Sequence, residues 1–282
     1  MWIWMSLGSA LLLGLYDVAK KYALRRNGVY YVLLSATAFT ALFLCPFLKA
    51  GPLEFHLRLI LKAFLVSTSW VAGMIALKLL PITTVSTLKA SRPMFVVLLS
   101  IVLFGERLNL LQWCGVVVVL SALWLLSRVS SGEGIRFSSS KGFWAAVVSI
   151  LSGVASALWD KHILADMEPL FVQSWTNVYI TVILAVIVAV KALRDGSGRE
   201  RFRWDWTLPA IAVLITAADA LYFFSLKSPD AMLSVISLIR RSSVIVTFAL
   251  GAWLFKEKNV RRKGLVMLLL LSGIVLLMAG SM

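Results

Sequence analysis

Residues 83–93 read Thr83-Thr84-Val85-Ser86-Thr87-Leu88-Lys89-Ala90-Ser91-Arg92-Pro93, and they place a lysine deep inside an apolar segment. A second cation, Arg240, follows 151 residues later (240 − 89), in Ser234-Val235-Ile236-Ser237-Leu238-Ile239-Arg240-Arg241. The same offset superposes Leu103-Phe104-Gly105-Glu106-Arg107 on Leu254-Phe255-Lys256-Glu257-Lys258. These matches indicate an internal duplication with a buried cation at the same place in each copy.

The composition is that of an integral membrane protein. Hydrophobic residues make up 60% of the 282 residues, charged residues 15%, and the mean hydropathy is +0.91. Because about 20 apolar residues suffice to cross a bilayer as a helix, we expect an all-α integral membrane fold with ten transmembrane helices. The predicted spans are 2–22, 30–48, 59–79, 82–104, 109–127, 141–163, 169–191, 207–226, 230–255 and 262–280.

A Ser/Gly-rich linker at 129–140 divides the spans into two sets of five. We therefore expect an N-terminal five-helix repeat over 1–128 and a C-terminal one over 141–282. Since five is an odd number, homologous halves must enter the membrane in opposite senses, as an inverted repeat. Transporters built in this way hold their substrate near the bilayer midplane, between the repeats.

The formal charge of +15 suggests a nucleic-acid partner, but the distribution of the cations argues against one. Eighteen Lys and Arg residues lie in the odd-numbered connections between spans and six in the even-numbered ones. This bias is a topology signal, and it predicts that both termini lie outside the cytoplasm. No cluster with metal-ligand spacing accompanies the two histidines, His56 and His162, so we expect neither a metal nor another cofactor. Cys45 and Cys114 lie in apolar sequence and are expected to be buried free thiols.

Cations inside the spans are the candidate binding residues. A charge at membrane depth costs about 2.5–3.5 kcal/mol on insertion scales, so it faces a polar cavity or a partner. Two interpretations stay open: the cations pair internally with aspartates, or they hold a mobile anion, which an excess of cations over deep carboxylates favours. The cations are Lys89, Arg92, Arg240 and Arg241, and the possible partners are Asp17, Asp160, Asp219 and Asp230.

Further candidates flank these charges. Tyr16-Asp17 and Trp159-Asp160 occupy similar places in the two halves, where they either line the cavity or end helices at the interface. Asp219, with Tyr222 one turn later, is either a proton site or the counterion of an arginine. Glu106 and Glu257 suit local ion pairing, or gating at a mouth of the cavity.

The paired five-span halves, with Phe-Gly-Glu-Arg-Leu at 104–108 and Phe-Lys-Glu-Lys at 255–258, resemble the EamA-like branch of the drug/metabolite transporter superfamily. This resemblance covers essentially the whole chain, and it implies ten helices around a central substrate cavity. It leaves the substrate open, because the superfamily moves amino acids, nucleotide sugars, amines and organophosphates.

A narrower resemblance concerns the charged segments. The triose-phosphate/phosphate translocators of the superfamily carry a Lys-Ala-x-x-Pro motif and, later, a Lys-Arg pair that together hold the substrate phosphate. Lys89-Ala90-Ser91-Arg92-Pro93 matches the motif, and Arg240-Arg241 stands where the pair would be. The resemblance thus makes Lys89, Arg240 and Arg241 candidate phosphate ligands. Arg92 and Arg240 depart from the translocator pattern but keep or increase the positive charge.

We therefore predict a secondary transporter that moves a small anionic, phosphorylated metabolite by alternating access, in a bacterial inner membrane. Its substrate-binding residues would be Lys89, Arg240, Arg241, Arg92, Asp219, Tyr16, Tyr222 and Trp159. The alternatives are an exporter of amino acids or other zwitterions and, in another class, a non-transporting membrane scaffold. An enzyme is not expected, since no acid/base constellation stands out.

Overall fold

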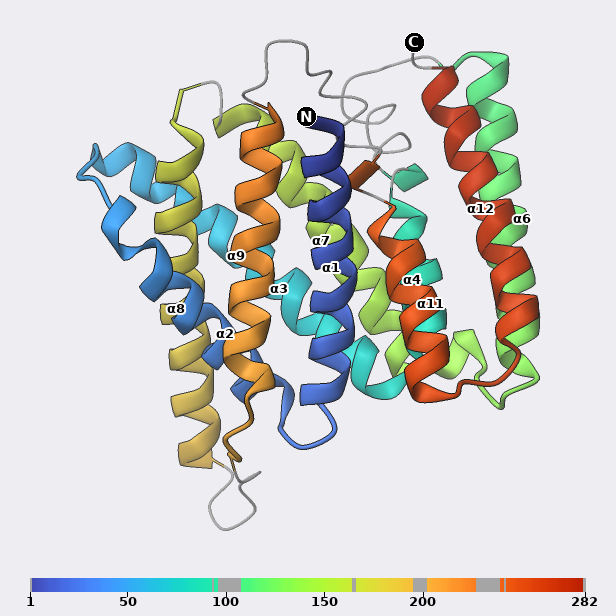
Figure 1. The fold of residues 1–282 in the computed structure, drawn as a ribbon, viewed down its shortest axis with the longest axis horizontal. Coiled ribbons are helices and arrows are strands. Elements are labelled where there is room, and N and C mark those ends of the chain that lie inside the picture. Colours follow the sequence, from blue (N-terminus) through green and yellow to red (C-terminus); the bar gives the residue numbers. More distant parts are fainter. Residues whose placement is uncertain are drawn as a thin grey trace.

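The computed structural model describes residues 2–92, 94–95, 108–163, 166–194, 202–226, 239–240 and 242–280, and the regular structure within them is helical (Figure 1). Two short 3₁₀ turns, Cys45–Phe47 and Phe137–Ser139, accompany ten described α-helices. The helices are α1 (Trp2–Ala23), α2 (Val29–Leu44), α3 (Leu53–Leu79), α4 (Ile82–Ala90), α6 (Leu110–Ser131), α7 (Lys141–Ile163), α8 (Pro169–Arg194), α9 (Thr207–Leu226), α11 (Ser243–Phe255) and α12 (Val260–Ala279).

Many of these helices have the length and composition of membrane spans. Five segments are long and apolar enough to cross a bilayer: Trp2–Ala23, Val29–Phe47, Leu53–Leu79, Leu110–Ser131 and Leu170–Leu193. The outer surface is rich in exposed large apolar side chains, such as Trp4, Leu110 and Trp253, which a soluble protein would not present in such numbers. The expected all-α membrane fold is thereby confirmed.

Helices of the first half pack mainly against helices of the second half. The most extensive contacts join α3 with α7, α6 with α12, and α1 with α9, followed by α2 with α8 and α1 with α11. Helices α6 and α12 form a pair at one edge of the bundle, while α1 runs through its middle (Figure 1). The halves therefore share their interior instead of folding as separate units.

The start of α1 and the end of α12 lie at the same end of the bundle (Figure 1). The connections from α3 to α4 and from α11 to α12 lie at the opposite end. This arrangement is the one expected for an even number of crossings.

Small and hydroxyl-bearing residues bring the central helices close together. The Ser9 hydroxyl of α1 donates to the carbonyl of Ala218 in α9 at 2.7 Å. Ser69 of α3 and Ser149 of α7 exchange a reciprocal pair of hydroxyl–carbonyl bonds, both of 2.7 Å. Such contacts replace the hydrophobic effect, which does not drive helix association in lipid.

Helix boundaries differ from prediction where polar residues interrupt the apolar segments. Helix α3 begins at Leu53, not at 59, because Arg58 pairs with Glu54 one turn earlier and with Asp166 at 2.9 Å. These pairs compensate the charges that lowered the local hydropathy. Helix α6 continues to Ser131, into the predicted linker.

The linker is partly packed, and the two thiols differ from expectation. Ile135 and Phe137 of the linker pack against the hydrophobic core, so this part of the 129–140 stretch is not loose. Cys45 and Cys114 are free, as expected, but the prediction that they are buried is wrong. Both lie on the outer surface of the bundle, where lipid takes the place of a protein core. The division into two five-helix repeats stays a prediction.

Candidate functional site

A group of charged side chains occupies the interior of the bundle, and its first part centres on Asp17 of α1. Lys20, one turn later on the same helix, places its Nζ 2.6 Å from Asp17 Oδ1. Lys89 of α4 approaches the same oxygen from across the bundle, at 3.4 Å. One carboxylate is thus shared between two lysines, and the bond to Lys89 is the longer one.

Asp219 of α9 is the centre of the second part. It forms an ion pair with Arg240, while Gln173 of α8 donates to its other oxygen at 3.3 Å. The Arg240 guanidinium also lies 4.3 Å from the ring centroid of Tyr222, one turn beyond Asp219. This is a cation–π contact, which holds the planar guanidinium in one orientation.

Tyr16 connects the two parts. It lies within electrostatic range of Asp17, Lys89 and Asp219. Lys62 of α3 acts on Asp219 in the same way and adds to the positive potential. We call Asp17, Lys20, Lys89, Asp219 and Arg240 the central charge cluster.

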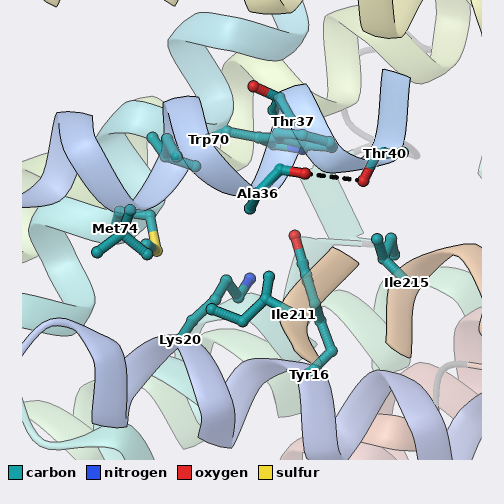
Figure 2. Close-up of a pocket in the computed structure, with 11 residues that line it drawn as sticks. Tyr16, Lys20, Ala36, Thr37, Thr40, Trp70, Met74, Ile211 and Ile215 are labelled. Carbon is teal, nitrogen blue, oxygen red and sulfur yellow. Dashed lines mark hydrogen bonds between the residues drawn. The ribbon is translucent and has the colours of Figure 1, made fainter. Parts of the chain in front are cut away.

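A small pocket, whose enclosed space is close to that of a single water molecule, lies beside the central charge cluster (Figure 2). The Tyr16 hydroxyl and the Lys20 ammonium point into it from α1, and the indole of Trp70 lies across from them. Most of the remaining lining is apolar. The other lining residues are Val32, Leu33, Ala36, Thr37, Thr40, Met74, Ile211 and Ile215.

The structure brings together five of the eight predicted site residues: Lys89, Arg240, Asp219, Tyr16 and Tyr222. Of the alternatives considered for the cations, internal pairing is realised for both Lys89 and Arg240. Asp219 correspondingly stands as the counterion of Arg240.

Arg92 and Trp159 have other surroundings. The Arg92 guanidinium lies against Gly153 of α7, where a Cβ atom would be only 2.2 Å from its Nη2. The Trp159 indole donates to the carbonyl of Arg58 at 3.1 Å and packs in a peripheral cluster with Ile163. Arg241 lies outside the described residues.

Sequence reasoning left Lys20 out of the site. Hydropathy placed it at the end of a helix, where a lysine can reach the lipid headgroups. The signal that identifies it is its spacing from Asp17, because residues three apart on a helix share a face. Gln173 and Trp70 gave no comparable signal.

The central charge cluster suits the binding of an organic anion. Within the described residues it contains three cations and two carboxylates, so one positive charge is in excess. Arginine offers a planar fork to phosphate or carboxylate, while lysine contributes a point charge. No group of three or more His, Cys, Asp or Glu residues in the described part of the chain is placed to hold a metal ion.

Comparisons with known proteins agree with this architecture. A riboflavin transporter of Rhizobium johnstonii is 29% identical over 213 residues, which cover 68% of this chain and 67% of that protein. A solved structure described only as "Crystal structure of protein" has a TM-score of 0.65 and 14% identity, and it covers 96% of this chain and 94% of its own. That likeness concerns the fold alone.

The model of the EamA-like transporter family matches residues 1–128 and 140–279. The match covers nearly the whole chain, including both segments that carry the cations of the central charge cluster. This chain therefore belongs to the EamA-like transporter family, as an integral membrane protein with a role in membrane transport.

Proposed function

We propose that this protein is a secondary transporter of a small organic anion, with phosphorylated metabolites as the first substrate class. The observation that carries this proposal is the excess of cations over carboxylates in the central charge cluster, next to a pocket. An excess positive charge in the interior of a membrane protein is costly. A bound anion would neutralise it.

The geometry suggests how an anion would enter. Lys89 is the more weakly held partner of Asp17, and Lys20 remains to neutralise that carboxylate when Lys89 turns to a ligand. Among the contacts of the described residues, Asp219 engages only one nitrogen of the Arg240 fork. At each cation, the bound phosphate would then take the place of a protein carboxylate.

A second candidate substrate is a planar aromatic metabolite. Tyr16 and Trp70 face the same pocket, and their rings are suited to stacking. The relative named a riboflavin transporter supports this candidate. An aromatic metabolite with an anionic group would use both the pocket and the central charge cluster.

Transport would proceed by alternating access between two inverted repeats with five spans each. The helix contacts support this symmetry. In this symmetry α1, α2, α3 and α6 correspond to α7, α8, α9 and α12. The α1–α9 contact then corresponds to the α3–α7 contact, and the α2–α9 contact to the α3–α8 contact. The pairs α2–α8 and α6–α12 are each converted into themselves.

The membrane would be a bacterial inner membrane, in keeping with the bacterial relative, with both termini outside the cytoplasm. A reporter that is active only outside the cytoplasm, fused after Met282, should be active. If only a reporter that works in the cytoplasm is active at this position, the predicted orientation is reversed. Lys20, which lies inside the bundle, would then be one of the cations that misled the count.

The substrate is tested by thermal unfolding of the purified protein with five ligands: inorganic phosphate, a triose phosphate, riboflavin, riboflavin 5′-phosphate and a neutral amino acid. A ligand at 100 times its Kd stabilises the folded state by about 2.7 kcal/mol. We expect stabilisation by phosphorylated ligands and its loss in Lys89→Ala. Lys49→Ala, which breaks only an exposed pair with Glu168, is the matched control.

The pair of riboflavin and its 5′-phosphate separates the two candidates. Stabilisation by the phosphate ester alone supports the anion site. Equal stabilisation by both, unchanged in Lys89→Ala, supports an aromatic substrate and contradicts the anion site. Stabilisation by the neutral amino acid alone supports a zwitterionic substrate.

A further inference from the structure

The joint between α3 and α4 lies at the end of the bundle opposite the start of α1 and the end of α12 (Figure 1). Helix α3 ends at Leu79 and α4 begins at Ile82, so only Leu80 and Pro81 separate them. Two helix ends therefore meet here, and each leaves backbone groups without partners inside its own helix. Side chains from two distant segments satisfy some of these groups.

Glu257, in the connection between α11 and α12, caps the start of α4. Its carboxylate accepts the backbone N–H of Ile82 at 2.6 Å and that of Thr83 at 3.0 Å, together with the Thr83 hydroxyl. An anion at a helix N-terminus is stabilised by free N–H groups and by the helix dipole. Glu257 was predicted to act in local ion pairing or gating. Its bonds go to the other half of the chain.

Lys21 caps the other side of the joint. Its ammonium donates to the carbonyl of Leu80 at 2.6 Å and to that of Leu77, in the last turn of α3. A cation at a helix C-terminus is stabilised by the opposite end of the dipole. The joint is thus held between a cation from α1 and an anion from the α11–α12 connection.

A second layer closes over these bonds. Lys263 of α12 is completely buried, and its Nζ lies 2.7 Å from Glu133 of the linker and 3.3 Å from the Thr83 hydroxyl. Gly251 of α11 lies so close to Ile82 that a Cβ atom there would be 2.3 Å from its Cγ2. Glu257, Lys21, Thr83, Lys263 and Glu133 form what we call the joint cluster.

We infer that the joint cluster is the closure between the two halves on this side of the membrane, and that it must open for a substrate to pass. The inference rests on the proposed transport function. The cluster ties α1 and the α3–α4 joint of the first half to the α11–α12 region of the second. The described conformation is the one closed at this end.

The pocket and the closure share consecutive turns of two helices. On α1, Lys20 lines the pocket and the next residue, Lys21, holds the joint. On α3, Met74 lines the pocket, and Leu77 accepts from Lys21 one turn later. A ligand in the pocket touches the turn of α1 that carries Lys20, and it therefore acts on the segment that carries Lys21. This adjacency provides a route from substrate binding to opening.

The test measures how fast a membrane-impermeant maleimide labels a single cysteine at Met74→Cys, in a chain with Cys45→Ser and Cys114→Ser. The reagent is applied separately from each side of membrane vesicles, and no substrate is needed. In the parent protein, labelling from the side of the joint should be slow. Glu257→Gln removes charge-assisted bonds to two backbone groups.

Glu257→Gln should raise labelling from the side of the joint by roughly 10-fold or more, the worth of one hydrogen bond to a charged group. Labelling from the side of the termini should fall, because the two openings alternate. Thr83→Val, which loses the hydroxyl contacts with Glu257 and Lys263 but keeps both backbone N–H groups, should give a smaller increase in the same direction. It also serves if Glu257→Gln fails to fold.

The matched control is Glu168→Gln, which breaks an exposed pair with Lys49 at 3.0 Å and should leave labelling unchanged. Unchanged labelling in both joint variants would overturn the inference. So would an equal increase from both sides, since general loosening and not an opening at one end would explain it. These outcomes do not depend on the substrate, so failure of the proposed anion site would leave the test intact.

Discussion

The central charge cluster and the joint cluster use the same side-chain types, yet they differ in exposure and in the groups they bind. In the central charge cluster, Lys89 is 28% exposed and Arg240 23%, and both face carboxylates of similar exposure. In the joint cluster, Lys263 is 0% exposed and its partner Glu133 7%. The central ion pairs are open to a competing ligand, whereas the Lys263–Glu133 pair of the joint cluster is shielded from one.

The groups that are bound differ as well. Asp17 and Asp219 accept from side chains, which can turn to another partner at little cost. Glu257 accepts from the backbone of a helix start, whose N–H groups cannot rotate away. The first arrangement suits exchange with an anion. The second suits a contact that is either made or broken as a whole, as an opening between rigid helices requires.

The largest expected effect comes from breaking the driest pair. Lys263→Ala leaves Glu133 buried and without its cation, and removing one partner of a buried pair costs about 3–5 kcal/mol. Thermal or denaturant unfolding in detergent measures this loss. Adding Glu133→Gln should restore part of the stability, because the unpaired charge is then gone. If Lys263→Ala lowers the free energy of unfolding by less than Lys89→Ala does, the contrast in burial between the two clusters does not govern their stability.

Lys89→Ala and Arg240→Ala should act on binding rather than on folding. Each substitution should weaken binding of the anionic ligand by about 1.5–3 kcal/mol, or roughly 10- to 150-fold in Kd. Lys89→Ala should cost less than about 1 kcal/mol of stability, because Lys20 stays with Asp17 at 2.6 Å. Isothermal titration and unfolding of the same samples measure both quantities.

Arg240→Ala also leaves Asp219 with only Gln173 as a side-chain partner among the contacts described. The double variant Arg240→Ala/Asp219→Asn separates a lost ligand contact from an unpaired carboxylate. Its binding should stay weak while its stability recovers. Recovery of binding in the double variant would show that Arg240 serves Asp219 alone.

A smaller effect is expected at the aromatic wall of the pocket. Trp70→Leu removes a stacking surface worth about 0.5–1.5 kcal/mol, or roughly 2- to 13-fold in Kd, for a planar aromatic ligand. Binding of riboflavin 5′-phosphate should weaken by this factor, and binding of a triose phosphate should not change. Equal weakening of both ligands would mean that Trp70 supports the site without touching a ring.

The smallest effect is expected where helices are held by neutral hydrogen bonds. Ser149→Ala removes one of the two bonds of the reciprocal Ser69–Ser149 pair between α3 and α7, and such bonds in membrane helices average about 0.6 kcal/mol. Ser121→Ala is the matched control, because its hydroxyl bonds to Val117 within its own helix at 2.8 Å. A loss of several kcal/mol of stability in Ser149→Ala would show that this pair matters as much to folding as the ion pair of the joint cluster.

Sequence periodicity and hydropathy predicted the helices well where the segment was apolar to both ends. Residues 207–226 were predicted as a span, and α9 covers Thr207–Leu226. The start of α3 was missed by six residues, since Glu54 and Arg58 lower the hydropathy although they compensate each other in the helix. Hydropathy sums single residues and does not register such pairs.

The candidate site was predicted only in part, because single residues were recognised and their pairings were not. Lys89 and Arg240 were found because a charge inside an apolar run is conspicuous. Lys20 was left out of the site because hydropathy puts it near a helix end. Its spacing from Asp17 places both on one face of α1, but only the packing of α1 shows that this face meets the pocket. Glu257 was marked by its match with Glu106. Its partners are backbone groups 174 and 175 residues away, which no pattern of side chains reveals.

By itself, the sequence determined that the chain is helical and membrane-embedded, and that matching places in its two halves carry cations. These properties follow from local sums and spacings along one chain. Only the tertiary structure decided that Lys89 shares Asp17 with Lys20, that Arg240 faces Asp219, and that Glu257 caps α4. The physical reason is that ion pairs and caps depend on distances across helix contacts, and those distances exist only once the two halves have packed together.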